Sequence, residues 1–199
     1  MTAADLLALA AFEEDRHAQS FPSFGSERTG APVVAYCRLD ERAIRTREPI
    51  VAPDCLVVID PTLVHQVDLF AGLRPDGWLL VNSARPLDEL GLTADAAGLA
   101  EGHVLGVPAT EVAQRHVGRP LPNAALLGGF AALTGQVSLQ ALTAAIRDRF
   151  ATNPSVAERN AAAAAEVFHI AQTNRATNSD TPFGAAATGG KAMLGAAPA

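Results

Sequence analysis

Three uninterrupted runs of apolar residues set the pattern of this chain, and each ends at a polar or proline-containing turn. The runs are Cys55–Ile59, Gly77–Asn82 and His103–Val107. A short continuous apolar run is typical of a strand buried on both faces, and each run is followed by the start of a helix. Repeated strand–helix units predict parallel βαβ connections. We therefore expect an α/β fold, a three-layer Rossmann-like open sheet with mostly parallel strands.

Apolar residues at helical spacing predict helices before and after these strands. The expected helices are Thr2–Glu14, capped by Thr2; Ala124–Thr134, capped by Asn123; Leu139–Phe150, capped by Ser138; and Val156–Asn174. The adjacent glycines 128 and 129 weaken the second of these helices. They predict that another backbone packs closely against it.

The stretch Ala18–Pro32, between the first helix and the first expected strand (Pro32–Arg38), is too irregular for a helix and too broken for one strand. Two glycines enclose its polar tip, so the backbone there can approach a ligand or another chain. The tip and its closing glycine are Ser26, Glu27, Arg28, Thr29 and Gly30. The guanidinium of Arg28 is a planar fork that suits a phosphate or a carboxylate. A surface hairpin with solvated charges is the alternative, and residue types alone leave both open.

Polar residues also follow the apolar runs. Ligands of open α/β sheets gather at the carboxyl ends of the strands. The candidates there are Asp60, Thr62, Asn82, Ser83, Arg85 and Thr110. Asp60 is the one carboxylate among them, and capping of the next helix is a better explanation for it than catalysis. The polar segment Asp40–Pro49 is expected to be an excursion over the surface.

Composition and charge narrow the function. The 199 residues are 49% hydrophobic and 18% charged, as expected for one globular α/β domain. The net charge is −6 and no segment concentrates Lys or Arg, which argues against a nucleic-acid interface. We also recognise neither a signal peptide nor an apolar run of membrane-spanning length, and so expect a cytoplasmic protein.

The residues that carry chemistry do not form a complete catalytic constellation. Cys37 and Cys55 stand alone in apolar segments, where packing is a better explanation than metal binding or a disulfide. No two of the five histidines are four residues apart, the helical spacing that suits a metal. Nucleophile elbow, P-loop and H-E-x-x-H motifs are absent from the sequence. We therefore expect no catalytic residue and no metal ligand in this chain.

Taken together, the motifs resemble one family. The segment AQSFPSFGSERTGAPV is similar to the hallmark of gamma subunits, or fused gamma domains, of pyruvate:ferredoxin oxidoreductases within the 2-oxoacid:acceptor oxidoreductase family. The resemblance continues through IRTREPI, PDCLVVIDPTL, DGWLLVNS, VPATEVA and GRPLPNAALLGGFAALTG, and covers roughly residues 2–174. The SERTG form is similar to the pyruvate type of gamma subunit.

The resemblance implies one departure from the family. Its members begin with a strand and a glycine-rich turn, G-x-G-G-Q-G, directly before the helix that here starts at Thr2. The expected fold therefore lacks its first strand and that turn. Either the start is truncated or mis-assigned, or another chain supplies the strand. A buried strand would otherwise be left with an unpaired edge.

The resemblance also implies a function. The family decarboxylates a 2-oxoacid, here most simply pyruvate, and forms acyl-CoA, CO2 and reduced ferredoxin. Thiamine pyrophosphate, Mg and 4Fe-4S clusters lie on alpha, beta and ferredoxin-like delta subunits, and none on the gamma chain. The gamma chain is implied to help bind coenzyme A, through residues 26–30, and to cover the active site. Alternatives are a purely structural assembly subunit, and an independent nucleotide-binding domain, which the missing glycine-rich turn disfavours.

The C-terminus differs in composition from the rest. Residues 175–199 contain few large apolar side chains, too few to offset the entropy of ordering them. We expect one gamma-type domain over residues 1–174 and a tail over 175–199 that is disordered or lies on a partner subunit. Phe183, Met193 and Leu194 are the expected anchors of that tail.

Overall fold

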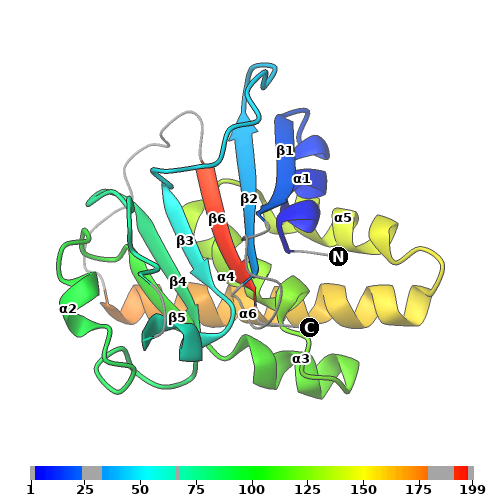
Figure 1. Cartoon of the computed structure of the whole chain (residues 1–199). Helices are drawn as coiled ribbons and strands as arrows, with labels where there is room; N and C mark the ends of the chain where they lie inside the picture. The colour runs from blue at the N-terminus through cyan, green and yellow to red at the C-terminus, as the bar shows by residue number, and fades with distance from the viewer. Residues whose placement is uncertain (1–2, 24–32, 66–67, 179–190, 197–199) are drawn as a thin grey trace.

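The computed structural model describes residues 3–23, 33–65, 68–178 and 191–196 (Figure 1). Its helices are α1 (Ala3–Phe12), the 3-10 helix η1 (Pro61–His65), α2 (Thr93–Ala96), α3 (Ala109–Val117), α4 (Asn123–Thr134), α5 (Leu139–Arg149) and α6 (Pro154–Asn178). Its strands are β1 (His17–Ser23), β2 (Val33–Asp40), β3 (Cys55–Val58), β4 (Trp78–Asn82), β5 (Val104–Val107) and β6 (Lys191–Ala196).

The described strands form one open sheet in the order β1-β2-β6-β3-β4-β5. The pairs β6–β3, β3–β4 and β4–β5 are parallel, whereas β1–β2 and β2–β6 are antiparallel. The three apolar runs of the sequence are the neighbouring strands β3, β4 and β5, and each strand lies within its predicted run. The expectation of an open, mostly parallel α/β sheet is confirmed.

Side chains from the two faces of the sheet belong to two separate apolar clusters. On one face, alternate residues of β2, β3, β4 and β5 pack against the long helices α1, α3, α4, α5 and α6. On the other face, Leu56, Val58, Leu79 and Val81 pack against Leu63 of η1 and against Leu69, Leu90 and Leu92 from the connecting segments. This division explains why the parallel strands read as continuous apolar runs, since both of their faces are buried.

Glycine permits a close backbone contact between α4 and α6. A Cβ atom on Gly128 would lie 1.9 Å from the carbonyl oxygen of Ala164 in α6. On Gly129 it would instead meet side-chain methyl groups of Leu80 and Val107 at 3.2 Å. The close backbone approach predicted from the glycine pair is therefore confirmed, and it occurs at Gly128.

No described helix has the combination of length and apolar character that a bilayer crossing requires.

Of the two predicted helix caps that lie among the described residues, one is confirmed. Ser138 caps α5, because its hydroxyl oxygen accepts a hydrogen bond from the amide of Ala141 at 3.1 Å. Asn123 is not a cap and lies inside α4, whose first backbone hydrogen bond is accepted by the carbonyl oxygen of Pro122. Thr2, the predicted cap of α1, lies outside the described residues.

The stretch predicted to be irregular contains a strand. β1 (His17–Ser23) pairs with β2 over its whole length, from the His17–Asp40 pair to the Ser23–Val34 pair. Pro22 made this segment look broken, because proline cannot donate a backbone hydrogen bond. β1 is the edge of the described sheet, where the missing donor is tolerated.

The expectation for the C-terminus is wrong for the residues described there. α6 continues to Asn178, beyond the predicted domain end at residue 174. Lys191–Ala196 is then neither disordered nor on a partner, but forms β6 between β2 and β3 (Figure 1). Pairing on both sides gives this small-residue segment backbone hydrogen bonds that composition does not reveal. Phe183, one of the expected anchors, lies outside the described residues.

Candidate functional site

The carboxyl ends of the parallel strands meet at one edge of the sheet. Val58, the last residue of β3, is level with Gly195 of β6, and Gly195 is level with Val34 of β2. The end of β1 at Ser23 pairs with Val34 and so lies at the same edge. The segment that joins β1 to β2 therefore starts and finishes at the carboxyl edge. The predicted site residues Ser26, Glu27, Arg28, Thr29 and Gly30 belong to that segment and lie outside the described residues.

Two of the strand-end polar residues, Asn82 and Thr110, form structural contacts with each other. The amide nitrogen of the Asn82 side chain donates to the carbonyl oxygen of Ile59 and to the hydroxyl of Thr110, both at 2.8 Å. The side-chain oxygen of Asn82 accepts from the backbone amide of Thr110 at 3.1 Å. Asn82 is only 7% exposed. It thus ties the end of β3 to the first turn of α3, and all three bonds hold the fold.

The remaining strand-end residues make local turns. One carboxylate oxygen of Asp60 accepts hydrogen bonds from the backbone amide of Thr62 at 2.9 Å and from its hydroxyl at 2.7 Å. This is the capping role preferred for Asp60 from the sequence. The hydroxyl of Ser83 accepts from the backbone amide of Arg85 at 2.9 Å. The described polar residues of the carboxyl edge therefore hold the strand ends and turns in place, and none of them is arranged as a catalytic group.

Sequence reasoning missed a polar group inside the sheet. Arg38 of β2 is 7% exposed, and its guanidinium lies over the ring of Phe21, 5.3 Å from the ring centre. One terminal nitrogen donates to the side-chain oxygen of Gln19 at 3.2 Å, and the other donates to the carbonyl oxygen of Glu48. Phe21 also contacts Tyr36, with ring centres 5.3 Å apart. The sequence feature that could have revealed this buried group is an arginine, Arg38, placed two residues after the aromatic Tyr36 in an otherwise apolar strand.

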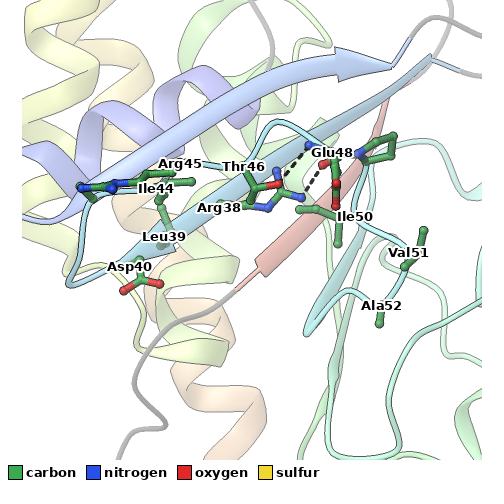
Figure 2. A pocket seen from close by; sticks show the side chains of 12 residues that line it. Arg38, Leu39, Asp40, Ile44, Arg45, Thr46, Glu48, Ile50, Val51 and Ala52 are labelled. Atoms are coloured by element: carbon green, nitrogen blue, oxygen red, sulfur yellow. Dashed lines mark hydrogen bonds between the residues drawn. The ribbon is translucent and has the colours of Figure 1, made fainter.

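The bond from Arg38 to Glu48 shapes a hollow at the opposite, amino edge of the sheet (Figure 2). The hollow has a volume of about 500 Å3 and lies between the end of β2 and the segment 43–52. Within this segment Ile50 is buried, whereas Val51 is 83% exposed. The segment overlaps the surface excursion predicted for Asp40–Pro49. It lies at the far end of β2 from the predicted ligand loop.

The described titratable groups do not assemble into a reactive centre. Burial raises the pKa of the Cys37 thiol to about 12, with a smaller contribution from Asp5. Burial and Asp54 raise the pKa of Cys55 further above its ordinary range. Both thiols are free and buried, as predicted, and neither is available as a thiolate. Within the described ranges, no group of three His, Cys, Asp or Glu side chains is placed to hold a metal ion.

Fold and site together define a class of protein: an α/β domain with an open, mostly parallel sheet, a loop position at its carboxyl edge and no catalytic centre among the described residues. Residues 1–170 match the family described as pyruvate ferredoxin/flavodoxin oxidoreductase. The chain belongs to this family.

Relatives and a solved structure agree with this membership. The chain is 41% identical to the pyruvate/ketoisovalerate oxidoreductases common subunit gamma of Pyrococcus abyssi, over 86% of this chain and 90% of that one. It is also 41% identical to the NADH-dependent phenylglyoxylate dehydrogenase subunit gamma of Aromatoleum evansii, over 84% and 88%. The crystal structure of pyruvate oxidoreductase subunit PORC from Thermotoga maritima matches with a TM-score of 0.67 and 31% identity, over 84% and 86%. The resemblance to gamma subunits drawn from the sequence is confirmed.

Proposed function

We propose that this chain is the gamma subunit of a 2-oxoacid:ferredoxin oxidoreductase, most simply a pyruvate-oxidising one, and that it helps to bind coenzyme A and to cover the active site. The observation that carries the proposal is the family match over residues 1–170, joined to the position of the SERTG loop. That loop connects strands whose ends lie at the carboxyl edge of the sheet. Ligands of open α/β sheets bind at this edge.

Coenzyme A is the ligand that the loop residues suit. Its phosphates match the planar donor fork of Arg28, and two glycines allow the backbone to come close. Ser26 and Thr29 add hydroxyl groups, and Glu27 and Gly30 complete the proposed contact segment. Asn82 and Asp60 already form structural hydrogen bonds, so the loop residues are better candidates than these two for contacting a ligand. This supports the proposal.

The redox and decarboxylation cofactors belong to partner subunits in this proposal. A 4Fe-4S cluster needs about four cysteine thiolates. This chain has two cysteines, and both are buried with raised pKa values. They do not fit a cluster. We therefore assign thiamine pyrophosphate, Mg and the clusters to alpha, beta and delta subunits, with ferredoxin as the electron acceptor.

The names of two relatives argue against a role for this chain in choosing the oxoacid or the electron acceptor. One relative is named for pyruvate and ketoisovalerate, and another for phenylglyoxylate and NADH, at the same 41% identity. A gamma chain so similar to both is a poor candidate for choosing the oxoacid or the acceptor. Its proposed role is a shared one, the handling of coenzyme A.

The test is Arg28→Ala in the assembled complex. Loss of one charge-assisted hydrogen bond, worth about 1.5–3 kcal/mol, should raise the KM for coenzyme A about 10-fold or more. Release of CO2 from the 2-oxoacid, measured without coenzyme A, should stay nearly unchanged. The matched control is Arg45→Ala, which removes an exposed arginine at the amino edge and should leave both quantities unaltered.

The alternative function, a purely structural assembly subunit, predicts a different result. In that case Arg28→Ala would leave the KM for coenzyme A unchanged in every complex that assembles, and the mutation would act on assembly alone. Size-exclusion chromatography of the variant with its co-purifying chains measures assembly separately from the KM.

A further inference from the structure

The last strand of the chain lies in the interior of the sheet. β6 pairs antiparallel with β2, from the Val33–Ala196 pair to the Arg38–Lys191 pair. On its other side it pairs in parallel with the whole of β3. β2 and β3 are not neighbours in the sheet, so β6 alone joins the hairpin β1–β2 to the parallel strands (Figure 1).

Both neighbours of β6 are held in place by contacts that do not involve it. α1 packs on β1 and β2 and also contacts α4 and α5. α4 packs on β4 and β5, and residues Cys55 and Val57 of β3 belong to the same helix-side cluster. The helix layer therefore fixes the positions of both β2 and β3. Without β6, two unpaired strand edges would face each other across a gap one strand wide.

We propose that the gap between β2 and β3 is a strand-acceptor site, and that Lys191–Ala196 is a detachable occupant that also binds there as a separate peptide. Unpaired strand edges bind extended segments through backbone hydrogen bonds. This site offers such an edge on each side, antiparallel along β2 and parallel along β3. Among the described elements, β6 is held chiefly by its pairing with β2 and β3, and no described helix packs on it to a comparable extent.

Two native thiols report on the occupant. Cys37 of β2 and Cys55 of β3 are both paired with Ala192, one from each side. Cα atoms of directly opposed residues in neighbouring antiparallel strands lie about 4.5–5.5 Å apart, within the range of about 4.4–6.8 Å that a disulfide spans. A cysteine at position 192 is therefore in reach of Cys37. Position 193 is paired with Tyr36 and Leu56, and carries no native thiol at its level.

The experiment has two stages, each with Ala192→Cys and the matched control Met193→Cys. The first stage refolds the full chain from urea in the presence of oxidised glutathione, because Cys37 and Cys55 are buried in the folded protein and must react before the sheet closes over them. Ala192→Cys should form an internal disulfide to Cys37 or Cys55, identified by peptide mapping, and Met193→Cys should not. Absence of the disulfide in Ala192→Cys would overturn the placement of the occupant.

The second stage tests detachment. A protease site is introduced within residues 179–190 of the otherwise native chain, which is folded and then cut. An excess of labelled peptide covering residues 189–197 with Ala192→Cys is added under the same oxidant. We expect the peptide to cross-link to Cys37 or Cys55, and the Met193→Cys peptide to fail.

A peptide that also carries Met193→Pro and Leu194→Pro lacks adjacent backbone donors and should lose at least 10-fold in cross-linking yield. If the cut protein takes up no peptide although the full-length variant forms its disulfide, the occupant is a fixed strand and the proposal is wrong. Coenzyme A takes no part in these readouts, so the result is independent of the proposed function.

Discussion

The two halves of the sheet are stabilised in different ways. The parallel strands β3, β4 and β5 are buried on both faces, by long helices on one side and by connecting segments on the other. The antiparallel pair β1–β2 has α1 on one face, while on the other face Phe21 contacts both Tyr36 and Arg38. The parallel half depends on apolar burial that many residues share. The antiparallel half depends on a few specific contacts and on β6, and it carries the proposed ligand loop.

This difference separates stability from function in the molecule. The best-packed region supplies no reactive group among its described residues, and its polar side chains are used for structure. The proposed contacts with coenzyme A lie on a loop that the less buried half presents. Binding residues commonly lie on loops positioned by a rigid scaffold. Substitutions in the parallel half should therefore change the free energy of unfolding, and substitutions in the antiparallel half should act more locally.

The largest effect is expected where two helices of the parallel half meet. In Gly128→Ala the added Cβ would lie 1.9 Å from the carbonyl oxygen of Ala164, so α4 and α6 must move apart. Overpacking against a backbone should lower the free energy of unfolding by about 3 kcal/mol. Urea denaturation followed by circular dichroism measures it.

Gly129→Ala is the matched control for this prediction. Its Cβ would meet only side-chain methyl groups of Leu80 and Val107 at 3.2 Å, and alanine also favours the helix. We expect a change within about 1 kcal/mol. Equal destabilisation by both substitutions would show that the helix contact is not specially close at Gly128.

The second effect concerns the polar link at the carboxyl edge. Asn82→Ala removes three hydrogen bonds and leaves the carbonyl of Ile59 and the amide of Thr110 without this partner. Buried groups left unsatisfied should cost about 2–3 kcal/mol in the free energy of unfolding. Thr110→Val removes only the hydroxyl acceptor and should cost about 1 kcal/mol. An unchanged midpoint of urea unfolding in Asn82→Ala would mean that the link contributes nothing.

Most of the parallel half could be predicted from the sequence, because burial on both faces leaves a direct trace in residue type. Each of β3, β4 and β5 lies within a predicted apolar run, and the glycine pair in α4 predicted the close contact between α4 and α6. β1 was missed because Pro22 obscures an edge strand. β6 was missed because its stability depends on pairing with β2 and β3, which are distant in sequence.

The candidate site was predictable only in part. Residues 26–30 came from glycine placement and from family resemblance, and they stay a prediction. Asp60 was correctly expected to cap η1, since the motif that does so is local. The roles of Asn82 and Arg38 were not predictable, because their partners Thr110 and Gln19 become neighbours only after the chain folds.

The third effect is expected in the antiparallel half. Arg38→Met keeps the apolar stem and removes the bonds to Glu48 and Gln19. We expect a loss of about 1–2 kcal/mol in the free energy of unfolding, since the desolvation cost of the buried cation is relieved at the same time. Hydrogen exchange should become faster in residues 41–54 and stay unchanged in β3–β5. Arg45→Met, on the exposed side of the same hollow, is the control and should alter neither measurement.

The smallest effect concerns the ion pairs between α3 and α6 on the helix layer of the parallel half. Glu166 contacts His116 at 2.6 Å and also pairs with Arg115. The hydrogen bond from His116, with help from Arg115, lowers the pKa of the Glu166 carboxyl. A lowered pKa in the folded state means that the stabilisation is present above the ordinary carboxyl pKa of about 4.3 and is lost as the pH falls through the folded value.

Glu166→Gln should therefore be less stable than the natural protein at pH 6 by less than about 1 kcal/mol, because the group is partly solvated. The difference should shrink as the pH falls below about 4, since the natural protein then loses the same charge. Thermal melts between pH 3 and pH 7 measure this convergence. Glu101→Gln, an exposed carboxylate for which the described residues show no ion pair, is the control and should follow the natural protein at every pH. A difference for Glu166→Gln that stays constant down to pH 3 would show that packing of the side chain, and not its charge, joins α3 to α6.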